Sequence, residues 1–275
     1  MQDTTQMYSN LADMKGIWGG YEGSLDYQRS FKKKDKLLTT TYKASYSPRG
    51  SDNYTDIENV INSFDRKQHI RSNSSGSEQT FQLDYTEPFN KKHVIEIGAK
   101  YIYRHNQSEN DYKLFNFSSS VWESIAGIVD KKMLHTTGVL GAYGSYTYKL
   151  EKISARVGGR LERTTASIKR NGDEPYTQKP FTNLVPSITL SYKTTPGSNL
   201  QLSYTQRISR PDITYLNPFI NISDPKNISQ GNPELIPEIS NSFNLNYNLF
   251  TPKFNFNSSV FTSFANNSIE QVSSL

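Results

Sequence analysis

One long alternating hairpin near the middle of the chain most constrains its fold. Over residues 140–161, apolar or small side chains alternate with polar ones on both sides of a tight connection at Glu151 and Lys152. Such period-two alternation places the two sets on opposite faces of a β-sheet. Each arm runs roughly 11 to 14 residues, against about 5–6 in an ordinary strand. At about 3.3 Å per residue an arm reaches roughly 40 Å, which is enough to cross a bilayer core at a tilt.

Four further stretches repeat this alternation, each around a short turn. They cover residues 21–46, 81–104, 184–204 and 243–260. We therefore expect about ten strands in five hairpins. The segments between hairpins are long and polar, at roughly 47–76, 105–132, 170–181 and 208–240. Short turns at one end and long loops at the other are typical of bacterial outer-membrane barrels. The pattern predicts an all-β fold, an antiparallel transmembrane β-barrel segment.

Composition narrows the class of protein. No run of about 18 apolar residues exists, which excludes a helical membrane protein. A hydrophobic content of 34% and a mean hydropathy of −0.69 still suit a barrel, where only alternate strand residues need be apolar. Cysteine is absent, so the chain has no disulfide framework or thiolate site. The net charge of +5 is scattered along the chain, which argues against a nucleic-acid partner. Residues 1–5 resemble no signal peptide, and no cofactor is expected.

Charged residues on the polar face of the strands are the first candidate site. They are Glu96, Lys100, Arg104, Arg156, Arg160, Glu162 and Arg207. A charge facing lipid at mid-depth would cost about 2–4 kcal/mol, so we expect these side chains to face a wet barrel interior. Ion pairs across the wall are their expected role, with contact to a substrate as the alternative.

The second candidate is a loop rich in proline between residues 203 and 238. Its notable positions are Arg210, Pro211, Asn217, Pro218, Phe219, Asp224, Pro225, Gly231, Asn232 and Pro233. Proline lacks a backbone donor, so a regular strand cannot continue here. We expect an ordered excursion over the barrel rim, with a structural role favoured over ligand binding.

The order and spacing of these loop residues resemble TonB-dependent outer-membrane receptors, in particular the outer-membrane β-barrel family common in Bacteroidetes. Residues 158–164 also resemble the family's G-x-R-x-E-x-T strand, and residues 184–187 resemble the start of its next strand. The resemblance implies a parent barrel of about 22 strands that encloses a plug domain. It also implies uptake of a scarce nutrient, driven by the TonB complex, in the bacterial cell outer membrane.

The chain departs from the full pattern of that family. No plug and no C-terminal strand ending in an aromatic residue are recognisable, so residues 1–275 are predicted to be a partial barrel domain. The partners implied by the resemblance are outer-membrane lipid, the plug domain of a parent chain, the TonB complex and an unidentified nutrient.

Two other functions remain open from sequence. A small independent outer-membrane barrel could carry hydrolase activity at its mouth, where His105, His135, Asp111 and Asp130 would supply a base and carboxylates. These four residues have no fixed spacing, and the histidines lack the pairing of metal ligands. The other alternative is a soluble extracellular β-protein that binds carbohydrate.

Overall fold

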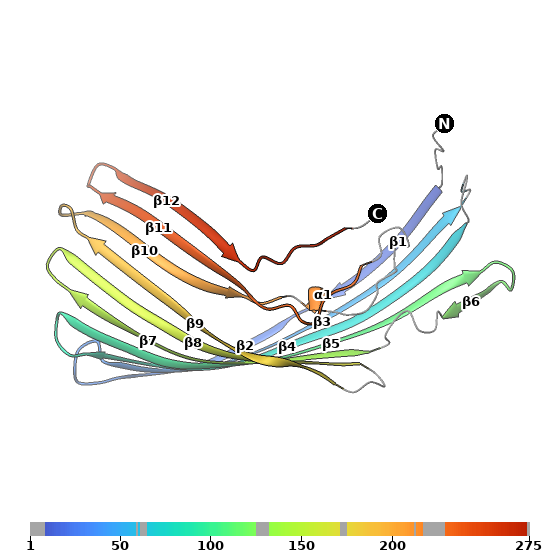
Figure 1. The fold of residues 1–275 in the computed structure, drawn as a ribbon, viewed down its shortest axis with the longest axis horizontal. Coiled ribbons are helices and arrows are strands. Elements are labelled where there is room, and N and C mark those ends of the chain that lie inside the picture. The colour runs from blue at the N-terminus through green and yellow to red at the C-terminus, as the bar shows by residue number, and fades with distance from the viewer. Residues whose placement is uncertain are drawn as a thin grey trace.

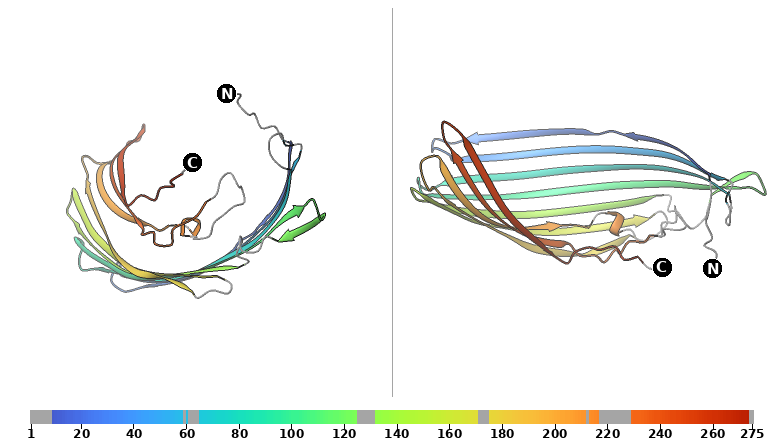
Figure 2. Two further views of the ribbon diagram at one scale, coloured as in Figure 1. Left: turned by 45° about the vertical axis from the view of Figure 1, so that its right-hand side comes forward. Right: turned by 90° about the horizontal axis from the view of Figure 1, so that it is seen from above.

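The chain forms one antiparallel sheet that curves into an open trough (Figure 1). The computed structural model describes residues 9–58, 60, 65–124, 132–170, 175–211, 213–216 and 229–273. Its elements are β1 (Ser9–Trp18), β2 (Tyr21–Ser30), β3 (Leu37–Glu58), β4 (Arg66–Pro88), β5 (His93–Asn116), β6 (Val121–Ser124), β7 (Met133–Lys149), β8 (Ile153–Arg170), β9 (Tyr176–Tyr192), β10 (Ser198–Ser209), α1 (Ile213–Leu216), β11 (Glu238–Phe250) and β12 (Asn255–Asn266). Seen nearly end-on, the sheet is an arc with α1 on its concave side (Figure 2).

The strand order follows the chain, as expected for consecutive hairpins. The sheet runs β1-β3-β4-β5-β7-β8-β9-β10-β11-β12, while β2 also pairs with β3 and β6 pairs with β5. The five predicted turns are confirmed, and all of them lie at one end of the trough (Figure 1). The all-β antiparallel barrel segment predicted from the alternation is therefore the observed fold.

Two of the polar segments at the other end, 47–76 and 105–132, are largely strand where the structure describes them, which corrects their assignment as loops. β3, β4 and β5 contain 22, 23 and 24 residues, and β3 pairs with β4 as far as Ile57 and Arg66. Residues 66–76 carry polar side chains on both faces, so their sequence has no alternation to reveal a strand. The sheet thus extends well beyond its apolar part.

The first strand of the trough is interrupted at Gly19 and Gly20. β1 and β2 pair with successive parts of β3, and Gly19 N–H donates to the carbonyl of Pro48 at 3.1 Å. In a strand, the N–H and C=O of one residue point towards the same neighbouring strand. The C=O of Pro48 points towards Gly19, so the N–H that proline lacks would also have faced the break between β1 and β2. β1 was not predicted from the sequence because its alternation is broken: Asp13 and Lys15 lie on the same face as Leu11 and Ile17.

A bulge in β9 changes which side chains face inward. Thr164 pairs with Phe181 and Ala166 with Gln178, so Lys179 and Pro180 together oppose Thr165. An extra residue in one strand reverses the facing of every residue beyond it. Gln178 consequently faces the concave side, where Nε2 donates to the carbonyl of Leu235 at 2.9 Å.

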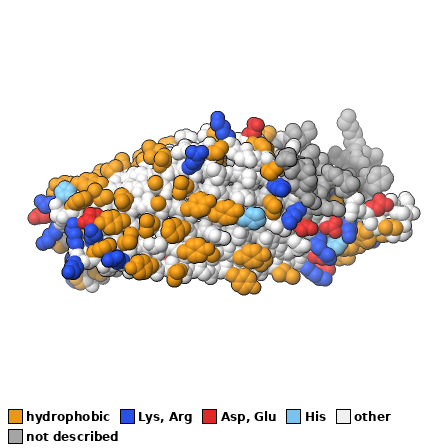
Figure 3. Space-filling model, turned by 90° about the horizontal axis from the view of Figure 1, so that it is seen from below, with side chains coloured by type: hydrophobic (Ala, Val, Ile, Leu, Met, Phe, Trp, Pro, Cys, Tyr) orange, Lys and Arg blue, Asp and Glu red, His pale blue; other side chains and the backbone are white. Residues whose placement is uncertain are grey.

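The convex face carries an apolar band over the half of the sheet near the short turns. Its members include Leu25, Tyr42, Leu83, Ile97, Leu140, Val157, Leu190, Leu202 and Leu245, all exposed. Apolar side chains spread over the middle of this face, while charges gather towards its ends (Figure 3). Such a band is what the lipid-facing wall of a barrel requires. Among the described residues, no helix is both long and apolar enough to cross a membrane.

Candidate functional site

The concave face holds a hollow of about 970 Å³ over β5, β7, β8 and β9. Six of the seven charged residues predicted to face inward line it: Glu96, Lys100, Arg156, Arg160, Glu162 and Arg207. The seventh, Arg104, lines a neighbouring hollow, where its Nε lies 2.5 Å from Glu78 Oε2. Strand alternation places all seven on one face because each strand presents every second residue to the concave side.

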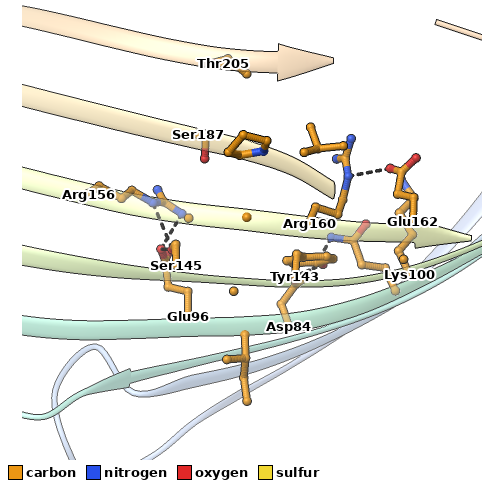
Figure 4. Close-up of a pocket in the computed structure, with 18 of the residues that line it drawn as sticks. Asp84, Glu96, Lys100, Tyr143, Ser145, Arg156, Arg160, Glu162, Ser187 and Thr205 are labelled. Atoms are coloured by element: carbon orange, nitrogen blue, oxygen red, sulfur yellow. Dashed lines mark hydrogen bonds and ion pairs between the residues drawn. The ribbon is translucent and has the colours of Figure 1, made fainter. Parts of the chain in front are cut away.

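Glu96 and Arg156 form an ion pair that crosses β7. Arg156 Nη2 lies 2.5 Å from Glu96 Oε2, and Ser145 Oγ donates to the same carboxylate at 2.8 Å. Ser145 is the β7 residue between them, as Figure 4 shows. The carboxylate is therefore satisfied within the wall.

Glu162 is the most buried charge in the hollow, with its side chain 10% exposed. Arg160 Nε lies 2.6 Å from Oε1, and Arg210 Nη2 donates to Oε2 at 2.5 Å. Arg210 also donates to Thr164 Oγ1 from Nε at 3.2 Å and from Nη2 at 3.1 Å. Thr164 is 2% exposed, so this contact is enclosed. Two segments that carry the family resemblance, the β8 motif and the start of the loop, therefore meet here.

Tyr143 spans the inner face from β7 to β4. Its hydroxyl donates to Asp84 Oδ1 at 2.5 Å, and Gln82 Nε2 donates to Asp84 Oδ2 at 2.8 Å. The β5 residue between them is Gly98, and a Cβ at that position would lie 2.4 Å from Tyr143 Cε2. Glycine is therefore needed for the ring to lie across the sheet. Sequence reasoning missed this pair, although an inward glycine opposite a tyrosine was a usable signal.

The described parts of the loop after β10 lie inside the trough, where the sequence predicted an excursion over its rim. Asn232 N–H donates to the carbonyl of Tyr215 at 2.7 Å, and Leu216 is buried against Met133 and Ile168, with Leu235 beside them. Arg210, Asn232 and Pro233 are thus placed on the concave side, and Pro211 and Gly231 are their neighbours in the chain. The other predicted loop residues, Asn217, Pro218, Phe219, Asp224 and Pro225, lie outside the described residues.

The residues considered for hydrolysis are not assembled into a site. His135 pairs with Asn106, the neighbour of His105, so the two histidines point to opposite faces of the sheet. His135 is buried on the concave side, while Asp111 lies six residues from His105 along β5 and near Lys113. Asp130 lies outside the described residues. In the described part of the chain, no group of three or more metal-ligating side chains forms.

Two charge clusters lie outside the apolar band. Near the short turns, hydrogen bonds from Lys33, Tyr85 and Lys36 lower the pKa of Glu87 to about 2. In the polar extension of β3, hydrogen bonds from His69 and then Arg71 hold the pKa of Asp52 below its usual value. Both clusters stabilise the ends of the strands, away from the hollow.

The sequence matches one protein family over most of its length. Residues 29–274 fit the model of the outer membrane protein beta-barrel family. The chain belongs to this family. Its fold and membership place it in the bacterial outer membrane, which sets aside the soluble extracellular alternative. No curated protein sequence matches the chain.

Solved outer-membrane receptors have a similar fold at low sequence identity. The alcaligin receptor FauA from Bordetella pertussis is 15% identical with a TM-score of 0.50, and the match covers 98% of this chain and 52% of that one. The siderophore receptor PiuA from Acinetobacter baumannii is 12% identical, with a TM-score of 0.56 and coverages of 90% and 40%. The ferric-catecholate import receptor Fiu from E. coli K12 is 10% identical, with a TM-score of 0.53 and coverages of 87% and 42%. This chain spans about half of these receptors or less.

Proposed function

We propose that this chain is the barrel part of an outer-membrane receptor that binds and imports a nutrient in a TonB-dependent way. The observation that carries the proposal is the division of the sheet into an apolar convex face and a charged concave hollow. A wall of this kind separates lipid from a wet interior. The receptors with a similar fold are named as an alcaligin receptor, a siderophore receptor and a ferric-catecholate import receptor, which supports the same class of function.

A plug domain and the TonB complex are the partners of this proposed receptor. An open arc of ten strand positions leaves the concave hollow accessible, and a domain seated there would contact the charged wall. Nutrient specificity would then depend on the inward-turned loop, on the hollow and on the plug together, since binding residues concentrate on loops held by a rigid scaffold.

The proposal is tested by uptake in the bacterium that carries the gene. The gene is deleted and restored, and each strain is supplied with limiting ferric siderophores, other metal complexes and oligosaccharides as labelled compounds. We expect loss of energy-dependent uptake of one nutrient in the deletion strain and its return on complementation. A protonophore or removal of TonB should abolish the same uptake.

Two results would contradict the proposal. The first is a deletion strain that takes up every compound at the parental rate while the restored protein is present in the outer membrane. The second is uptake that depends on the protein but persists without TonB and without an energised inner membrane. No observation on the described residues favours catalysis as a second function.

A further inference from the structure

The inner wall carries an excess of positive charge around a single carboxylate. Four cations that line the hollow, Lys100, Arg160, Arg207 and Arg210, lie on the strands and loop around Glu162. We call these five residues the Glu162 cluster. Arg160 and Arg210 pair with Glu162, whereas Lys100 and Arg207 make no hydrogen bond or ion pair with any residue that the structure describes. With Arg156, five cations line the hollow against the three carboxylates Asp84, Glu96 and Glu162, so the hollow carries an excess of two positive charges.

The sheet brings Lys100 towards this carboxylate across a glycine. Lys100 pairs with Gly141, and Gly141 pairs with Glu162, so all three lie in one row of the sheet. A Cβ on Gly141 would lie 3.7 Å from Glu162 Cγ and 3.9 Å from Arg160 Cδ, so the glycine itself puts no side chain between the lysine and the glutamate. Figure 4 shows Lys100, Arg160 and Glu162 on the same side of the hollow.

Arg207 approaches the cluster from β10. The ladder between β10 and β9 covers Leu200–Thr205, so Arg207 lies beyond its end and pairs only with Ser240 of β11. Its side chain lines the hollow and is exposed, three residues before the anchored Arg210. The side chain thus faces the open hollow that Arg160 and Arg210 also line.

The other carboxylates of the hollow make no ion pair with Lys100 or Arg207. Glu96 is occupied by Arg156 and Ser145, and Asp84 accepts from Tyr143 and Gln82. A cleft whose wall carries an excess of one sign of charge attracts counter-ions. Arginine forks and a lysine ammonium match the oxygens of a carboxylate.

We propose that the Glu162 cluster binds a carboxylate group through Lys100 and Arg207. The carboxylate comes either from an acidic side chain elsewhere in the receptor or from a free anionic ligand. This inference rests on the proposed function in taking the concave face as the interior of a receptor barrel. It adds the chemical class of group that this wall recognises.

Carbodiimide coupling followed by peptide mass spectrometry tests the site in the full-length receptor in detergent. The carbodiimide activates a carboxylate, a lysine in contact with it forms the amide, and the reagent takes up the elements of water and leaves as a urea. One sample contains the receptor alone, and the other contains added succinate as a free dicarboxylate. The ion pair of Lys43 with Glu22, at 2.8 Å, is the internal positive control, and exposed Lys152 in a short turn gives the background.

The expected result is coupling of Lys100 well above that of Lys152. An amide to a distant peptide of the receptor identifies an internal carboxylate, and a succinate adduct identifies a site open to free ligands. Coupling of Lys100 no higher than that of Lys152 in both samples would overturn the proposal. Coupling to Glu162 alone would overturn it as well, because the local carboxylate would then neutralise the lysine.

A matched pair of variants tests the part played by Arg207. Arg207→Gln should lower coupling at Lys100 by about fivefold, the scale expected when one unit charge leaves a partly solvated site. Lys193→Gln removes one charge at the short turns and should leave the yield unchanged. Equal yields in both variants would remove Arg207 from the site. Coupling at Lys100 is measured without transport, so failure of the site and failure of the proposed import function are separate results.

Discussion

Arg210 and Glu162 are separated by 48 residues, and their side chains meet at 2.5 Å on the inner face of the sheet. The arginine follows β10, and the glutamate lies on β8, two strands away. This contact holds the start of the loop against the wall, and Thr164 completes it through two further hydrogen bonds. The loop is therefore anchored at a defined place inside the trough.

Removing the arginine should release the loop. A single cysteine at Leu235, in a chain that has none of its own, reports access to the packed part of the loop. Arg210→Ala should raise the rate of maleimide labelling there by about tenfold, since hydrogen bonds to charged groups contribute about 1.5–3 kcal/mol. Arg210→Lys should give an intermediate rate because an ammonium lacks the guanidinium fork. Arg163→Ala removes an exposed charge from β8, the strand that carries Glu162, and is the control. A labelling rate that Arg210→Ala leaves unchanged would show that the contact does not hold the loop.

The position of Gly98 beneath Tyr143 predicts a local packing conflict. Gly98→Ala should destabilise the barrel by about 1–3 kcal/mol, the usual effect of overpacking, because its Cβ would overlap the ring. Gly141→Ala faces the same side with its nearest atom at 3.7 Å and should change stability far less. Thermal unfolding in detergent measures the stability of both variants. In a Tyr143→Ala background, Gly98→Ala should cost little further stability, because the ring that its Cβ would overlap is absent. Additive effects of the two substitutions would contradict the proposed conflict.

Charge tolerance should differ between the two faces of the sheet. Val157 lies in the middle of the apolar band, and Val157→Lys should destabilise the folded receptor in vesicles by about 2–4 kcal/mol. Thr39 lies on the concave side opposite Asp84, where Thr39→Lys should be tolerated. Equilibrium unfolding from lipid vesicles compares the two variants. Equal destabilisation by both would contradict the assignment of the convex face to lipid.

The sequence predicted those parts of the fold in which one face is apolar. Alternation located the hairpins, their turns and the inward facing of residues such as Lys100 and Glu162. It could not reveal the extensions of β3, β4 and β5, because both faces are polar there. Contacts that depend on a loop folding inward, such as Arg210 with Glu162, were also out of reach. Period-two alternation predicts which face of a strand a residue lies on, but it does not predict which later segment of the chain packs against that face.

The short-turn end of the sheet should lose stability in acid through Glu87. Hydrogen bonds from Lys33, Tyr85 and Lys36 lower its pKa from 4.5 to about 2 in the folded protein. A carboxyl with a lowered pKa stabilises the fold fully above its unfolded value, so this contribution should decline from pH 4.5 and vanish near pH 2. Melting temperatures of the parent and of Glu87→Gln, measured across this range in detergent, should differ above pH 4.5 and converge near pH 2. Asp35→Asn, which changes an acidic residue in the neighbouring turn, is the control and should follow the parent curve. A difference between parent and Glu87→Gln that stays constant with pH would mean that the ionised carboxylate does not provide the stabilisation.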